Sequence, residues 1–395
     1  MIFQSLDDKD ECIGVYADGQ LWFDEVPSNL TQSWKYSGSL AAKEVEYAWL
    51  YCGGKTLDEA CPDSLALEWE SAQRKMRAYM KSFNIAKINF DDHCFFDLVP
   101  HDFLVKFCEI KNQITAHVFN AYPKPANYDY MNDAQQLLFK LKYRELNLNN
   151  VGGRKLFLNS FMRSASQKIL KGSPRIHYNL FGTVTGRLST HPQSFPILTM
   201  RKELRQLIKP HNDWFISLDY NGAELRTLLA LNGEPQPQED IHEWNIKNIF
   251  EDRNISREEA KTMFFAWFYN PESTYIQTNY YDREKVLAKY YDGDYINTIF
   301  GRYIQVSSWK AFNYLIQSTA ADLVIDRAIA IEKMLEDRKS SISHIVHDEV
   351  VIDFALEDRE LLKEIKNTFA ANKLDTFMVN LKAGPNYYEL ENLTL

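Results

Sequence analysis

Two acidic segments of the 395-residue chain contain residues that could hold divalent cations. Asp219 ends the apolar stretch "FISLDY", and Asp348 and Glu349 follow His347 between two apolar stretches in "SHIVHDEVVIDF". Two neighbouring carboxylates can bind two such ions, which activate a hydroxyl and stabilise a leaving pyrophosphate. Taken singly, Asp219 is explained as a turn cap and the second segment as a polar hairpin turn. The chemical interpretation requires both segments to be neighbours in one sheet.

A third segment, "SREEAKTMFFAWFYN", could bind a nucleotide. Ser256 and Glu259 form a capping box, which predicts a helix start. Four residues then follow at intervals of four and share one helical face: Arg257, Lys261, Phe265 and Tyr269. Two cations suit phosphate oxygens, and two rings suit a sugar and a base. The competing interpretation is an aromatic helix packed in a core with its charged ends in solvent.

A basic run could follow a phosphate backbone, although the net charge of −9 argues against a nucleic-acid partner on bulk grounds. Residues 140–175 contain Glu145 as their one acid and these cations: Lys140, Lys142, Arg144, Arg154, Lys155, Arg163, Lys168, Lys171 and Arg175. A solvated helical face is the alternative explanation.

The elements that must position these groups are a mixture of strands and helices. The pattern predicts a strand followed by a helix over residues 217–231. Further helices are predicted at 66–83, 101–119, 131–146 and 256–269, a strand with a turn at 12–25, and strand pairs at 175–190 and 343–354. Residues 120–130 are the most linker-like stretch.

Composition limits the class of protein. The chain is 45% hydrophobic, which is enough for globular cores, and it has no apolar run long enough to span a membrane and no signal-peptide pattern at its start. Five cysteines without a CxxC pair argue against a disulfide framework or a zinc site. We therefore expect a soluble chain in the cytoplasm.

Five motifs in this order resemble those of family A DNA polymerases, the bacterial DNA polymerase I type. They are "TGRLS" (185–189), "DYNGAELR" (219–226), "RxxxKxxxFxxxY" (257–269), "NYLIQSTAAD" (313–322) and "HDE" (347–349). The resemblance covers roughly residues 130–395. It implies an α+β fold of the right-hand polymerase type, with an antiparallel palm sheet, helical fingers and thumb, and a small N-terminal region.

The resemblance also implies domain ranges. The thumb would span 101–175, the palm 176–232 with 318–395, and the fingers 233–317. Residues 1–100 would form an N-terminal region, and too little chain precedes the thumb for a complete exonuclease domain. The acidic clusters of this region would be surface groups or remnants of a reduced exonuclease. This compact size suits a bacteriophage or mobile element.

The same resemblance implies roles for individual residues. Asp219 and Asp348 would bind two Mg²⁺ ions, with Mn²⁺ as a substitute, and Glu349 would lie beside them as a third catalytic acid. The dNTP would contact His242, Arg257, Lys261, Phe265 and Tyr269, with Glu224 beneath its sugar. Primer and template would contact Arg187, Asn313, Gln317 and His347, and the thumb tip would grip the duplex through Arg154 and Lys155.

Several positions depart from the family pattern. Asn221 and Gly222 replace Ser-Gln, Asn270 replaces a glycine after the fingers tyrosine, and Trp309 replaces a common arginine. "HPQSFPILT" (191–199) replaces an Asn-Leu-Gln-Asn-Ile-Pro pattern. The metal and triphosphate residues are intact, whereas the minor-groove contacts, and with them fidelity, are left open.

The expected activity is DNA-directed DNA synthesis with primer-template DNA and dNTPs as partners. A single-subunit RNA polymerase shares the palm and both aspartates, but Glu224 and "HDE" favour DNA. An inactive palm used as a DNA-binding scaffold would have lost carboxylates or fingers cations, and none is lost. The sequence leaves open whether a separate exonuclease or processivity subunit acts with the chain.

Overall fold

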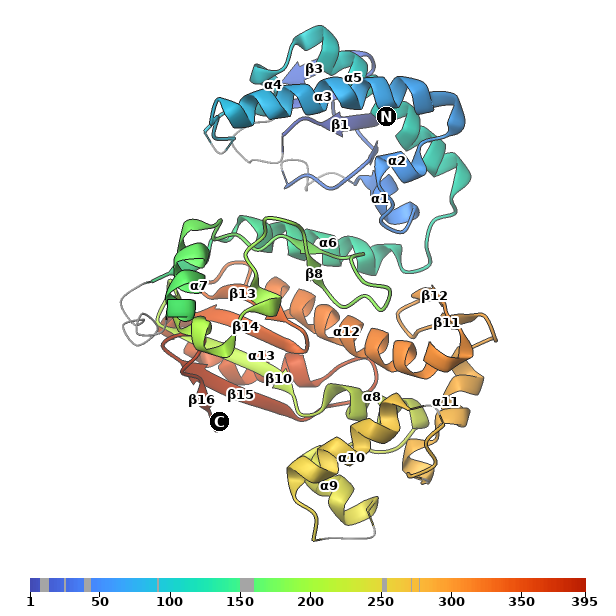
Figure 1. Cartoon of the computed structure of the whole chain (residues 1–395), viewed down its shortest axis with the longest axis vertical. Coiled ribbons are helices and arrows are strands. Elements are labelled where there is room, and N and C mark those ends of the chain that lie inside the picture. The colour runs from blue at the N-terminus through green and yellow to red at the C-terminus, as the bar shows by residue number, and fades with distance from the viewer. Residues whose placement is uncertain are drawn as a thin grey trace. The chain divides into compact units, whose positions relative to one another are not determined.

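The computed structural model describes residues 1–7, 14–24, 26–38, 44–90, 92–149, 160–250, 254–270, 272–276 and 278–395. Its internal contacts divide the chain into two compact units, Met1–Gln136 and Leu137–Leu395. Both units combine helices with a sheet, and the sheet of the second unit is antiparallel, which fits the predicted α+β class (Figure 1).

The first unit contains a five-stranded sheet in the order β3-β2-β1-β4-β5. Strand β1 pairs antiparallel with β2 and parallel with β4. The strands are β1 (Ile2–Ser5), β2 (Gly14–Ala17), β3 (Gln20–Phe23), β4 (Gln32–Ser33) and β5 (Glu46–Tyr47). The helices are α1 (Ala48–Tyr51), α2 (Leu57–Ala60), α3 (Ala66–Ile85), α4 (Phe95–Leu98) and α5 (His101–Ala121).

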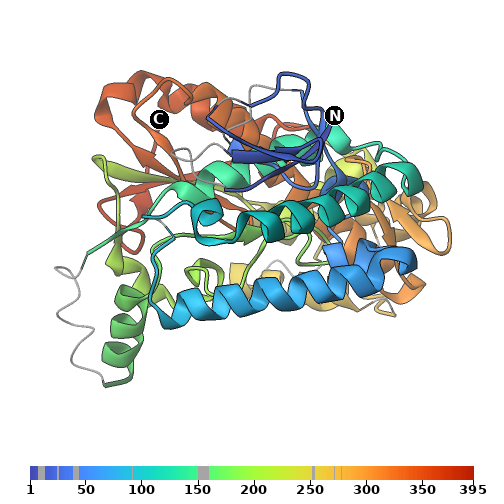
Figure 2. The same cartoon turned by 90° about the horizontal axis from the view of Figure 1, so that it is seen from above.

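The long helices α3 and α5 run side by side (Figure 2). Both are amphipathic, and their buried faces meet in a core that includes Trp34, Trp69 and Ile114. Helix α6 (Tyr128–Tyr143) follows and spans the boundary between the units.

The second unit is built on another five-stranded sheet, in the order β13-β14-β10-β15-β16. Its strands are β10 (Trp214–Tyr220), β13 (Ser341–Val346), β14 (Glu349–Phe354), β15 (Val379–Gly384) and β16 (Glu391–Asn392). All described pairings in this sheet are antiparallel. Residues Phe215–Leu218 of β10 are buried, as expected of a central strand.

Helices and short strand pairs complete the second unit. The helices are α7 (Ser160–Lys171), α8 (Ala223–Asn232), α9 (Ile241–Asn248), α10 (Arg257–Tyr269), α11 (Arg283–Tyr290), α12 (Ser308–Met334) and α13 (Leu362–Ala370). The strand pairs are β6 (Asn147–Leu148) with β9 (Ile208–Lys209), β7 (Tyr178–Asn179) with β8 (Ser189–Thr190), and β11 (Tyr295–Asn297) with β12 (Tyr303–Gln305). The 27-residue helix α12 packs on α8, α13 and the sheet (Figure 1).

The predicted elements are confirmed, within a few residues at their ends. The helices at 66–83, 101–119, 131–146 and 256–269 are α3, α5, α6 and α10, and the strand pairs at 175–190 and 343–354 are present. The strand and turn predicted at 12–25 are β2 and the turn after it, and the structure adds a second strand there, β3. The range 101–175 expected for the thumb is divided by the unit boundary, because α5 packs on α3 in the first unit. The first unit is accordingly larger than the N-terminal region expected at 1–100.

Two expectations from composition can be compared with the described residues. Within them, no helix has the length and apolar character needed to cross a membrane. Cys52, Cys61 and Cys108 are free thiols, whereas Cys94 is disulfide-bonded. A single disulfide-bonded cysteine does not amount to a disulfide framework. It does show that the cysteine spacing alone could not exclude a disulfide.

Candidate nucleotidyl-transfer site

The register of β10 places Asp219 between two neighbouring strands. Asp219 lies opposite Glu349 of β14 and opposite Asn380 of β15. Strands β13 and β14 form a hairpin whose turn consists of His347 and Asp348, with His347 in the left-handed region at φ 56°. The predicted pairing of the two acidic segments in one sheet is therefore confirmed.

The surroundings of Asp219 disfavour the ionised form of its carboxyl group. Burial and the charge of nearby Asp348 raise the pKa of Asp219 to about 7, although a hydrogen bond from Asn380 Nδ2 at 3.3 Å and the charge of Lys382 act in the opposite direction. Like charges at short range and loss of water both favour the protonated form. A cation at this position would reverse both effects.

Glu349 is held in a different way from the two aspartates. Its Oε1 accepts a hydrogen bond from Ser217 Oγ at 2.5 Å, and its Oε2 accepts one from Tyr387 OH at 2.7 Å. Both carboxylate oxygens are thus already engaged by the sheet, and Glu349 does not line the pocket that contains Asp219 and Asp348.

Helix α10 forms the wall that faces the carboxylates. The capping box of Ser256 and Glu259 starts it as predicted, with reciprocal hydrogen bonds between side chain and backbone. Lys261 and Phe265 line the pocket, whereas Phe264 is fully buried in the hydrophobic core of the unit. The helical register therefore presents Phe265, and not Phe264, to the pocket.

His242 and Arg257 complete the cationic side of the pocket. Arg257 donates to Asp240 through Nε at 3.2 Å and Nη2 at 2.8 Å. Burial, together with the charge of Arg257, lowers the pKa of His242 and so favours the neutral imidazole. Its Nδ1 is buried and has no hydrogen-bond partner among the described residues. A buried polar atom without a protein partner can pair with a bound water or ligand.

Glu224 links the two sides of the pocket. It is only 9% exposed, and it accepts hydrogen bonds from Arg187 Nη2 at 2.6 Å and from Tyr269 OH at 3.0 Å. Burial and the adjacent Glu224 raise the pKa of Tyr269 to about 12. Glu224 is thus fixed in place by two partners from distant segments of the chain.

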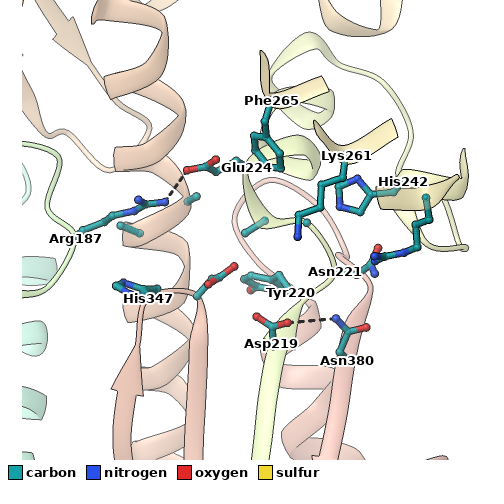
Figure 3. Close-up of a pocket in the computed structure, with 16 residues that line it drawn as sticks. Arg187, Asp219, Tyr220, Asn221, Glu224, His242, Lys261, Phe265, His347 and Asn380 are labelled. Atoms are coloured by element: carbon teal, nitrogen blue, oxygen red, sulfur yellow. Dashed lines mark hydrogen bonds and ion pairs between the residues drawn. The ribbon is translucent and has the colours of Figure 1, made fainter. Parts of the chain in front are cut away.

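These side chains surround one cavity of about 310 Å³ (Figure 3). In the close-up, Asp219 lies at the base with Asn380, Arg187 and His347 lie on one side, and Lys261 and His242 lie on the other. The predicted residues that line the cavity are Arg187, Asp219, Glu224, His242, Arg257, Lys261, Phe265, His347 and Asp348.

The remaining predicted residues lie elsewhere. Tyr269 is half-exposed and stacks on Phe265, with ring centroids 5.8 Å apart. Gln317 accepts a hydrogen bond from Thr185 Oγ1 at 3.1 Å, and Asn313 lines a second cavity beside α11. Arg154 and Lys155 lie outside the described residues.

The basic run is partly neutralised within the protein. Arg144 forms a bidentate ion pair with Glu332, at 2.6 and 2.8 Å. Lys140 pairs with Glu336, and Arg175 pairs with Glu145. Lys168 and Lys171 of α7 are exposed. The phosphate-binding interpretation of the run stays a prediction.

Sequence reasoning missed a buried ion pair behind the "TGR" segment. Arg302 pairs with Asp322 at 2.6 Å, and both side chains are buried. A Cβ on Gly186, where φ is 76°, would lie 2.4 Å from Arg302 Cζ. The loop that carries Arg187 thus rests on the Arg302 guanidinium. Asp322 is the last residue of the "NYLIQSTAAD" motif, and this motif was the sequence signal that could have identified the ion pair.

Comparisons with known proteins agree with this geometry. Residues 140–310 match the profile of DNA polymerase family A. The chain is 23% identical over 290 residues to DNA polymerase I of Caldicellulosiruptor bescii, covering 59% of this chain and 34% of that protein. It is 25% identical over 244 residues to the thermostable DNA polymerase I of Thermus aquaticus, covering 48% and 29%. The chain thus spans about a third of the length of these relatives.

A solved structure shares the fold. The POL domain of Pol1 from M. smegmatis, in complex with DNA primer-template and dNTP, superposes with a TM-score of 0.55 at 14% identity. The match covers 73% of this chain and 76% of that one. At this identity the likeness shows a common fold.

Proposed function

We propose that the chain is a family A DNA polymerase, a template-directed enzyme that adds dNTPs to a primer 3′ end. The observation that supports this most directly is the composition of one cavity. Asp219 and Asp348 line it, α10 contributes two cations and an aromatic ring, and α9 contributes His242. A primer hydroxyl, a triphosphate and a base require groups of these kinds.

The carboxylate pair fits divalent cations. Asp219 and Asp348 would hold them, because the hard oxygen ligands suit Mg²⁺ and the raised pKa of Asp219 marks a site that a cation would stabilise. Two Mg²⁺ ions, with Mn²⁺ as a substitute, are part of the proposal. When bound, the ions would supply Lewis-acid stabilisation of the charge that develops on the phosphate oxygens.

The other residues would bind and orient the substrate. Arg257 and Lys261 would neutralise the triphosphate, and His242 would offer its unpaired Nδ1 to the same group. Phe265, backed by the stacked ring of Tyr269, would face the base or sugar of the incoming nucleotide. Glu224 would lie below the sugar, in the space that a ribose 2′-hydroxyl requires.

We assign the sheet of β10, β13, β14 and β15 to the palm and α9 to α11 to the fingers. Residues of α6 and α7 would belong to the thumb, where Lys168 and Lys171 could contact the duplex backbone. Primer-template DNA and dNTPs are the proposed partners, with Arg187, His347, Asn313 and Gln317 on the DNA side.

Primer extension on a defined template with Mg²⁺ tests the proposal. We expect dNTPs, but not NTPs, to be added in template order. Extension with NTPs alone would indicate an RNA polymerase, and tight primer-template binding without extension would indicate a scaffold. A parallel reaction without dNTPs reports whether the chain shortens the primer.

A further inference from the structure

The turn between β10 and α8 differs from the family pattern, since Asn221 and Gly222 stand where Ser-Gln is usual. Gly222 has φ 71°, and a Cβ at this position would lie 2.5 Å from Ile241 Cγ2. The first residue of α9 therefore packs directly on this turn, and Gly222 permits both the backbone conformation and the close approach.

Asn221 uses this proximity to bind the start of α9. It is 4% exposed, and its Nδ2 donates to Asp240 Oδ2 at 2.8 Å. Its Oδ1 accepts from Ile241 N at 2.8 Å and from Arg226 Nη2 at 3.2 Å. The backbone N–H of Ile241 fixes which end of the amide is the oxygen, so Nδ2 must face the carboxylate. A serine side chain is too short to make the same set of contacts.

Asp240 in turn fixes Arg257. It caps α9 by accepting from the backbone N–H groups of His242 and Glu243, at 3.0 and 3.2 Å. Burial alone would raise the pKa of Asp240, but hydrogen bonds from Arg257 and Asn221 hold it far below its ordinary value. Nε and Nη2 of the Arg257 guanidinium donate to the Asp240 carboxylate, and Nη1 donates to the exposed Glu258. An arginine anchored along one edge loses less freedom when its remaining N–H groups bind a ligand.

We propose that Asn221 is a positioning residue: through Asp240 it fixes the guanidinium of Arg257 at the rim of the cavity and so sets the affinity for the nucleotide triphosphate. Asn221 lies on the same side of the cavity as His242 and Lys261 (Figure 3). The inference rests on the proposed function, because it takes the triphosphate to be the ligand of Arg257.

The first test measures kcat and KM for a matched dNTP in primer extension by Asn221→Ala. We expect KM to rise about 5- to 30-fold, the effect of losing one or two kcal/mol of binding. We expect kcat to stay within about threefold, because the substrate's reacting atoms keep their neighbours.

Asn232→Ala is the matched control, because Asn232 is 3% exposed and its side chain donates a hydrogen bond to Leu228 O within α8. It should leave KM unchanged. Asn221→Ser provides the same test if the alanine variant does not fold.

A double-mutant cycle separates positioning from a structural role. Removing Asn221 in an Arg257→Ala background should change the dNTP dissociation constant of the enzyme–primer-template complex by less than twofold, since the residue through which Asn221 acts is already gone. An unchanged KM in Asn221→Ala, a fall in kcat alone, or additive effects in the cycle would each overturn the inference. If the parent chain extends no primer, the proposed function is wrong. If the parent chain extends the primer and the two substitutions have additive effects, only the role of Asn221 is wrong.

Discussion

The two five-stranded sheets treat a buried polar group on the central strand in opposite ways. In the first unit, Gln4 of β1 is 1% exposed, and its Nε2 donates to Asn112 Oδ1 at 2.9 Å and to Thr115 Oγ1 at 3.1 Å. In the second unit, Asp219 of β10 meets a second carboxylate and one weak hydrogen-bond donor. The first group is satisfied by the protein, whereas the second is not.

The difference shows where chemistry is to be expected. A neutral amide whose N–H groups are paired with protein acceptors contributes to folding. A carboxylate whose pKa is raised to about 7 by burial and by Asp348 is held at a cost in the folded state. Such a cost is reasonable where a cation or substrate removes it, as we propose for the second sheet.

The largest expected effect comes from the carboxylates. Asp219→Asn and Asp348→Asn should each reduce extension by at least about a thousandfold, because each removes a proposed metal ligand without removing phosphate contacts. Quenched-flow extension measures the rate, and a fluorescence anisotropy titration should show nearly unchanged primer-template binding. A variant that retains extension within about tenfold of the parent would contradict the assignment of that carboxylate as a metal ligand.

A smaller effect is expected at Glu224, which the structure fixes between Arg187 and Tyr269. Glu224→Ala should increase ribonucleotide insertion relative to dNTP insertion by about ten- to several hundredfold, because steric exclusion of the 2′-hydroxyl is lost. Steady-state insertion of matched dNTP and NTP opposite one template base gives the ratio. Tyr269→Phe is the matched control, since it removes one hydrogen bond of Glu224 and keeps the carboxylate. An unchanged ratio in an active Glu224→Ala enzyme would exclude Glu224 as the sugar gate.

Phe265 should set the response to chain terminators. Phe265→Tyr adds a hydroxyl that can replace the missing sugar 3′-hydroxyl, so dideoxynucleotide incorporation should increase about tenfold or more. Competition between dNTP and ddNTP in a sequencing ladder measures the change. Phe264→Tyr is the control, because the fully buried Phe264 faces the core; terminator use that changes in this variant and not in the first would mean that α10 is rotated.

The smallest effect on activity is expected in the first sheet. Gln4→Leu leaves Asn112 and Thr115 without this donor and should lower the free energy of unfolding of the first unit by about 1–3 kcal/mol. Extension by the folded variant should be unchanged. Urea unfolding followed by tryptophan fluorescence and an extension assay test the two halves of this expectation. A large loss of extension without loss of stability would place Gln4 in the active machinery and remove the contrast between the sheets.

The sequence alone determined the local elements and the kinds of residue in the site. The capping box of Ser256 and Glu259 predicts where α10 starts, and the interval of four residues predicts that Lys261 and Phe265 share a face. Alternation broken by Asp219 predicts the end of a buried strand. These signals succeed because capping, helical periodicity and strand alternation depend on residues only a few positions apart.

The tertiary structure decided which partners these residues meet. Strand pairing placed Asp219 close to Asp348. It also let Ser217 and Tyr387 donate to the two carboxylate oxygens of Glu349. The two aspartates therefore face the pocket, whereas Glu349 is hydrogen-bonded within the protein. Packing also joined Asp240 to Arg257, neutralised part of the basic run, and buried Arg302 under the "TGR" loop. Each of these contacts joins segments distant in sequence, and its energy depends on burial and geometry that local patterns do not contain.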